Sequence, residues 1–89
     1  SRLLRAISRA ARQWEEAGHG DAAIDAYLRC IDADEQCEAF YRHLMLSHQR
    51  RGDTAEALAT YERLRTVLSA RLQGVPSAET QEVFARLRA

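Results

Sequence analysis

Apolar residues recur at intervals of three and four along most of the chain, the spacing that keeps side chains on one face of an α-helix. The first such run extends from Leu3 to Trp14 and predicts a helix over 2–17. Gly18 lies in a short polar break, and the apolar spacing then resumes, which predicts a second helix near 21–33. The chain therefore begins as two helices joined by a tight turn.

Two further helices follow, each with the same kind of apolar face. Asp34 is a suitable N-cap for the third helix, which runs until Gly52. Asp53 followed by Glu56 resembles a capping box at the start of a fourth helix near 54–72. The apolar positions of the third helix are Phe40, Tyr41, Leu44, Met45 and His48, and those of the fourth are Ala57, Leu58, Tyr61, Leu64, Leu68 and Leu72.

A fifth helix is expected after a bend at 73–76. Ser77 is a natural N-cap for it. Glu79 favours its first turn, because a carboxylate there faces the positive end of the helix dipole. The apolar face of this helix consists of Val83, Phe84 and Leu87.

The chain also repeats itself at an offset of 34 residues, the period of a tetratricopeptide helix–turn–helix unit. Gly18 returns as Gly52, Ala23 as Ala57, Tyr27 as Tyr61, and Trp14 as His48. The small residues allow two helices to approach closely, while the tyrosines fill the space between successive pairs. We therefore expect a structural core for the repeat made of Trp14, Ala23, Tyr27, His48, Ala57 and Tyr61.

These patterns predict an all-α fold with about five helices. Two tetratricopeptide-like hairpins would form a right-handed superhelical stack, and the C-terminal helix would cap it. The capping role follows because Glu82 stands where the repeat would require a third aromatic residue. Residues 1–89 are expected to form one small domain, and the helical pattern that starts at Arg2 predicts a piece of a longer protein.

Composition narrows the function classes. The chain carries 13 basic and 13 acidic residues, so it lacks the basic excess of a free-standing nucleic-acid binder. No stretch of about 18 apolar residues could cross a bilayer, and no secretory signal pattern is present. We expect a cytoplasmic location with no membrane contact, in which Cys30 and Cys37 remain reduced thiols.

The charges are nevertheless segregated along the chain. Residues 1–12 contain four arginines and no acid, whereas 13–38 contain eight acids against Arg29 alone. If the first helix of each hairpin lines a concave surface, guanidinium groups gather there and can grip carboxylates on another protein. The groove candidates are Arg5, Arg9, Arg12, Arg42, His43, Leu46 and Gln49. The alternatives are ion pairing within the chain and simple solvation of a charged surface.

Residues suited to metal binding or catalysis are present but not arranged for either. The histidines and cysteines show no CxxC or HxxxH spacing, so no metal is expected. Ser47 beside His43 and His48 is a hydroxyl–imidazole cluster with no third group to orient it. We predict no catalytic residue, no cofactor and no small-molecule ligand.

The second half of the chain carries a more specific signature. The segment Phe40–Tyr41–Arg42–His43–Leu44–Met45 leads into Arg51–Gly52–Asp53, then Ala55–Glu56–Ala57–Leu58, Tyr61–Glu62–Arg63–Leu64–Arg65, and Pro76–Ser77–Ala78–Glu79–Thr80. This run resembles the bacterial transcriptional activator domain, a tetratricopeptide-like module of regulatory proteins. Gln73, between Leu72 and Gly74, departs from the usual Leu-Gly-Val-x-Pro-Ser-x-Glu-Thr tail of that family.

The resemblance implies a place beside a winged-helix DNA-binding domain or downstream of a regulatory ATPase module. This sequence contains neither a winged helix nor a phosphate-binding loop. Our leading hypothesis is a non-catalytic domain for protein–protein interaction and oligomerisation. It would bind its own copy or a neighbouring domain of the same regulator, and reach DNA only through a separate domain. The alternatives are an adaptor that captures an acidic peptide and the regulatory domain of a signalling ATPase.

Overall fold

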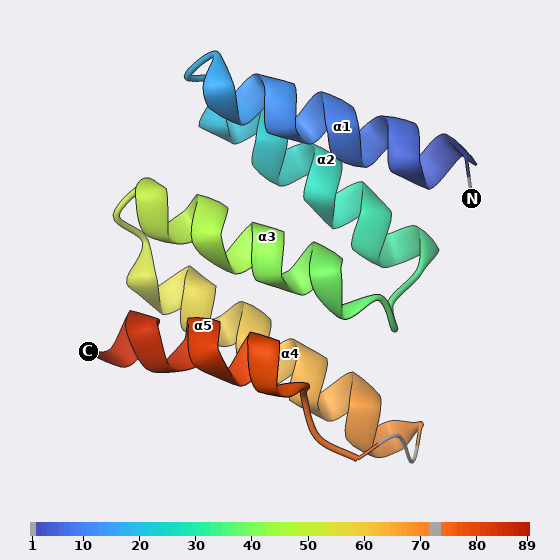
Figure 1. Cartoon of the computed structure of the whole chain (residues 1–89), viewed down its shortest axis with the longest axis vertical. Helices are drawn as coiled ribbons and strands as arrows, with labels where there is room; N and C mark the ends of the chain where they lie inside the picture. The colour runs from blue at the N-terminus through green and yellow to red at the C-terminus, as the bar shows by residue number, and fades with distance from the viewer. Residues whose placement is uncertain (1, 72–73) are drawn as a thin grey trace.

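Five helices, each antiparallel to the next, make up the described part of the chain (Figure 1). The computed structural model describes residues 2–71 and 74–89. The helices are α1 (Arg2–Glu16), α2 (Gly20–Ala33), α3 (Glu38–Arg50), α4 (Thr54–Ala70) and α5 (Ala78–Arg88). The predicted all-α fold is confirmed. The predictions for Leu72 and Gln73 lie outside the described residues.

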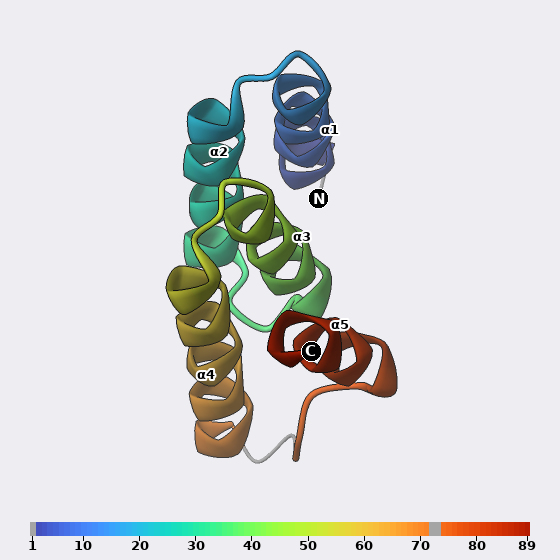
Figure 2. The ribbon, with the colours of Figure 1, turned by 90° about the vertical axis from the view of Figure 1, so that its left-hand side faces the viewer.

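The helices form two layers, which give the molecule the shape of a slab of 36 × 33 × 17 Å. Figure 2 shows α1, α3 and α5 in one layer and α2 and α4 in the other. The pairs α1–α2 and α3–α4 are the two hairpins, α2 packs against α3, and α5 packs against both α3 and α4. The right-handed sense of the stack remains a prediction.

The two hairpins turn in the same way. Gly18 and Gly52 both adopt positive φ, at 83° and 77°, a conformation that glycine reaches without strain. The amide of Gly18 donates to the Glu15 carbonyl at 3.0 Å, and the amide of His19 donates to the Trp14 carbonyl at 2.7 Å. The same two hydrogen bonds recur 34 residues later around Gly52. Each turn is therefore a Schellman motif, which satisfies the last carbonyls of its helix.

Two of the three predicted N-caps are confirmed. The Asp53 carboxylate accepts from the Glu56 amide at 3.1 Å, and the Ser77 hydroxyl accepts from the Thr80 amide at 3.3 Å. Asp34 does not cap the third helix, because its own amide closes the end of α2 on the Cys30 carbonyl at 2.9 Å. α3 begins later, after an N-cap residue whose side chain makes no capping hydrogen bond.

The core consists of two clusters of buried apolar side chains. The larger cluster joins α1, α2, α3 and the C-terminal half of α4, and the smaller one joins α3, α4 and α5. Ala23 and Ala57 are fully buried at equivalent places in the two hairpins, and Tyr27 and Tyr61 are also buried. His48 is half-buried. Cys30 is a buried free thiol within the larger cluster.

The expectation that Trp14 belongs to the core is wrong, because 45% of its surface is exposed. Its ring forms an edge-to-face pair with His19, with ring centroids 5.5 Å apart. On α3 the equivalent position is taken by His48, which is half-buried. Figure 1 shows α1 at the outer end of the stack, with no described helix beyond it to cover the tryptophan.

The last helix is held to α3 by polar contacts as well as by the smaller cluster. The Glu38 carboxylate accepts from the Ser77 amide at 2.9 Å and from the Thr80 hydroxyl at 2.8 Å. Arg42 donates to the Thr80 hydroxyl at 3.1 Å and pairs with Glu79 at 3.3 Å. These contacts fix α5 beside α3, which completes the three-helix layer.

Candidate functional site

A groove crosses the layer formed by α1, α3 and α5. Its first part is a hollow of about 470 Å³ between α1 and α3. The second part is a hollow of about 290 Å³ between α3 and α5. His43 and Leu46 line both hollows, so the two adjoin at these residues of α3. We call this surface the α1–α3–α5 groove. Its other residues are Arg12, Glu15, Glu16, Tyr27 and Arg50 in the first hollow, and Arg42, Glu79, Glu82, Val83 and Arg86 in the second.

An aromatic pair lines the first hollow. The rings of Tyr27 and His43 are stacked with centroids 5.3 Å apart and planes within 14°. Burial lowers the pKa of His43, and the nearby cations Arg42 and Arg12 lower it further. Burial also raises the pKa of Tyr27, with an added contribution from Glu15. Both shifts favour the neutral form of the ring, which suits contact with apolar groups.

Glu15 is the central charged group of the first hollow. Its carboxylate accepts a hydrogen bond from the buried Ser47 hydroxyl and pairs with Arg50 at 3.3 Å. The Glu15 side chain is only 16% exposed, whereas that of Arg50 is 59% exposed. The carboxylate therefore links α1 to α3 and leaves the arginine at the solvent edge.

Only some of the predicted groove residues come together. Arg12, His43 and Leu46 line the first hollow, and Arg42 lines the second. The exposed residues Arg5, Arg9 and Gln49 line neither hollow. These three therefore stay predictions with no support from the geometry of the groove.

The groove has less free positive charge than the sequence analysis predicted. Arg42 is engaged with α5, and Arg50 is paired with Glu15. Arg12 makes no ion pair with any residue of the described ranges. The groove therefore offers one unpaired guanidinium beside an apolar surface centred on Leu46.

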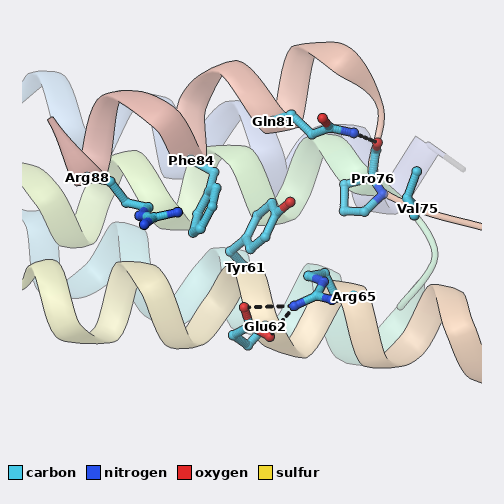
Figure 3. Close-up of a pocket in the computed structure, with 8 residues that line it drawn as sticks. All are labelled: Tyr61, Glu62, Arg65, Val75, Pro76, Gln81, Phe84 and Arg88. Atoms are coloured by element: carbon cyan, nitrogen blue, oxygen red, sulfur yellow. Dashed lines mark hydrogen bonds and ion pairs between the residues drawn. The ribbon is translucent and has the colours of Figure 1, made fainter.

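A separate hollow of about 470 Å³ lies between α4 and α5 (Figure 3). Phe84 reaches from α5 to stack on Tyr61 of α4, with centroids 3.9 Å apart, and the Arg88 guanidinium lies 5.2 Å from the Phe84 ring. Sequence reasoning assigned both rings to the core and missed this hollow. Its polar groups are largely paired within the fold, since Gln81 donates to the Pro76 carbonyl at 2.7 Å. We therefore assign it to the attachment of α5.

The described residues give no sign of other chemistry. Among them, no group of three or more His, Cys, Asp or Glu side chains is placed to hold a metal ion. Every buried side-chain polar atom in the same residues has a hydrogen-bond partner. In those ranges no helix is long and apolar enough to span a bilayer.

Two layers of antiparallel helices with a groove across one layer define a helical-repeat module, a class of protein built to present an extended surface. The sequence model of the bacterial transcriptional activator domain matches residues 1–88. The chain therefore belongs to the bacterial transcriptional activator domain family, a regulatory family with a role in bacterial transcriptional activation. No curated protein and no solved structure matches the chain.

Proposed function

We propose that this chain is a non-catalytic interaction domain of a bacterial transcriptional regulator, and that the α1–α3–α5 groove binds a segment of a neighbouring domain. The observation that carries the proposal is that His43 and Leu46 line both hollows, which places the two side by side across the layer of α1, α3 and α5. A bound segment could cross the whole three-helix layer along this path. In this role the domain would lie in the cytoplasm and would contact DNA only through a separate domain of the regulator.

The groove favours a segment with an apolar side chain and one carboxylate. Leu46 and the stacked pair of Tyr27 and His43 supply apolar surface, and Arg12 supplies the unpaired cation. The titratable groups Glu15 and Arg42 are engaged in contacts that hold the helices together. These engagements support a role in contact and not in catalysis.

A strongly acidic peptide is the second candidate, and the structure gives it less support. Such a ligand would need several free guanidinium groups at one place. Arg42 and Arg50 are already paired, and both Glu79 and Glu82 line the second hollow. An acidic peptide would therefore meet negative charge at the α5 end of the groove.

Selection of phage-displayed random peptides on the isolated 89-residue chain tests the proposal. We expect selected peptides to combine an apolar residue with an acidic one. Leu46→Asp should weaken their binding about tenfold, because a charge replaces the apolar centre of the contact. Ser69→Asp, an exposed position on α4, is the matched control and should have no effect. Failure to select any peptide, or equal binding by the Leu46→Asp variant, would contradict the groove assignment.

A further inference from the structure

α1 carries an uncovered apolar face at the outer end of the stack. Leu3 is 69% exposed and Trp14 is 45% exposed. Helical spacing places three alanines on the same side, and part of this face forms a hollow of about 250 Å³ beside Trp14. We call this surface the α1 face. It consists of Leu3, Ala6, Ala10, Trp14 and Ala17.

The repeat shows that this kind of face is normally covered by a helix. The residues that follow Leu3, Ala6 and Ala10 by 34 positions are Cys37, at the N-cap of α3, and Phe40 and Leu44 of α3. Phe40 and Leu44 are 9% and 2% exposed, within the cluster that α3 shares with α2. No helix of the described residues occupies the corresponding place beside α1 (Figure 1).

The sizes of the side chains select the helix that would fit. Phe40 and Leu44 of α3 share their cluster with the small residues Ala23 and Ala26 of α2. The α1 face has alanines where α3 has these large residues, so a partner must itself supply large side chains. α1 does so through Trp14 and Leu3, provided that a second copy lies antiparallel.

An antiparallel pair centred on Ala10 matches large against small on both sides of the axis, where the two Ala10 residues meet. Leu3 and Ala17 lie seven residues before and after Ala10, so each would face the other across the axis. Ala6 and Trp14 lie four residues before and after it and are paired in the same way. Each indole would therefore lie over an alanine of the second copy.

The charges of α1 also favour an antiparallel neighbour. The helix has no acid in its first turn and no base in its last. The charges at its two ends are therefore opposite to those that the helix dipole favours. Arg2 and Glu16 flank the α1 face on the same edge, and neither makes an ion pair within the described residues. An antiparallel second copy brings Arg2 of one chain beside Glu16 of the other. Arg9, on that edge near the axis, would face its own copy and oppose the pairing.

We propose that the α1 face binds a second copy of this chain, with the two α1 helices antiparallel about a two-fold axis at Ala10. This contact rests on the proposed role as an interaction domain but uses a surface outside the groove. The interface is isologous, so it closes as a dimer and does not propagate. A single helix pair is smaller than the standard interface of about 1,200–2,000 Å², so the dimer is weak and depends on concentration.

Sedimentation equilibrium over a range of concentrations tests the pairing. We expect the native chain to dimerise and Trp14→Ala to raise the dissociation constant about tenfold, because the indole is the largest contact. Leu3→Glu should have a similar effect, and Arg9→Gln should tighten the dimer. Val75→Glu is the control, since Val75 is 71% exposed outside α1. A chain that stays monomeric at millimolar concentration overturns the proposal. So does a dimer that neither Trp14→Ala nor Leu3→Glu weakens.

Disulfide trapping tests the register in a Cys37→Ser background, where the remaining Cys30 is buried. Ala10→Cys lies on the axis and should form a covalent dimer on mild oxidation, whereas Leu3→Cys alone should not. A mixture of Leu3→Cys and Ala17→Cys chains should cross-link. Equal trapping of all single variants overturns the antiparallel register. A monomer whose groove still binds the selected peptides refutes this inference and leaves the proposed function intact.

Discussion

At the scale of single residues, two alanines set the distance between paired helices. Ala23 and Ala57 are both fully buried, each at the same place in its hairpin. A methyl group is the largest side chain that such a close approach admits, because protein interiors have few voids. The stability of the fold therefore depends on these two residues more than their small apolar surface suggests.

We expect Ala57→Leu to destabilise the fold by about 1–3 kcal/mol, because the added carbons must displace packed neighbours. Urea denaturation followed by circular dichroism measures the change. Ala59→Leu, at an exposed position two residues further along α4, is the matched control and should leave the midpoint nearly unchanged. Equal stability of the two variants would show that the helices do not meet at Ala57.

Glu38 is the titratable residue whose ionisation matters most for the attachment of α5 to α3. Burial alone would raise its pKa, but hydrogen bonds from the Ser77 amide and the Thr80 hydroxyl, with help from Arg42, outweigh burial and lower the pKa below 4.5. The ionised carboxylate is therefore favoured in the folded state. Its contribution to stability is present above pH 4.5 and is lost as the pH falls through the folded pKa.

Glu38→Gln should accordingly lower stability at neutral pH by about 1–2 kcal/mol, since it removes hydrogen bonds to a charged acceptor. The difference from the native chain should shrink as the pH falls below 4.5. Thermal melts between pH 3 and pH 7 measure both effects. A stability difference that stays constant across this range would contradict the role of the charge.

At the scale of elements, the glycine turns decide where each hairpin folds back. Gly52 has a φ of 77°, and a Cβ built there would meet no atom within 4 Å. The cost of a side chain at this position is therefore backbone strain and not collision. Gly20 has an ordinary helical backbone, and a Cβ there would lie 3.4 Å from the flexible Arg51 side chain.

Gly52→Ala should destabilise the chain by about 1–2 kcal/mol, the strain of the left-handed conformation. Gly20→Ala should be neutral or slightly stabilising, because alanine favours a helix over glycine. The melting temperatures of the two variants, measured side by side, distinguish the strain of a left-handed backbone from the effect of adding a methyl group. A larger loss for Gly20→Ala would refute this account of the turns.

The sequence predicted the helices well because their signals are local. Apolar spacing placed all five, and the caps at Asp53 and Ser77 follow from residues three positions apart. Asp34 misled the prediction because the pattern does not show how many connecting residues separate α2 from α3. Its amide closes α2, and α3 starts only after the connecting residues.

At the scale of the whole molecule, the main helix contacts follow the order of the stack: α1 with α2, α2 with α3, α3 with α4, and α5 with α3 and α4. The end helix α1 contributes a single buried residue, Ala11. Such ends open more readily than the centre, because little buried surface holds them. The centre of the stack is formed by α2, α3 and α4.

Native-state hydrogen exchange should therefore show graded protection. We expect amides in α1 and α5 to exchange faster than those in α2 and α3, with free energies of opening below the global value. Raising the protein concentration should protect α1 selectively if its apolar face pairs with a second copy. Uniform protection at low concentration would show that the stack unfolds as one unit.

The candidate site was only partly predictable because it depends on contacts between distant residues. The sequence indicated an arginine-lined surface, but it could not show that Arg42 is engaged by Thr80 and Glu79 of α5. The exposure of Trp14 was hidden for the same reason, since the repeat pattern does not reveal which copy lacks a covering helix. Local spacing thus placed the helices, and the order of stacking decided which faces remained open.

The duplicated glycine turn has a practical consequence for anyone who edits this chain. Segments 14–19 and 48–53 close with the same pair of backbone hydrogen bonds around a left-handed glycine. The backbone of either turn could therefore replace that of the other, provided that Glu15 keeps its contacts with Ser47 and Arg50 and that Asp53 keeps its N-cap of α4. The same six-residue turn could join further helical hairpins in a longer designed array.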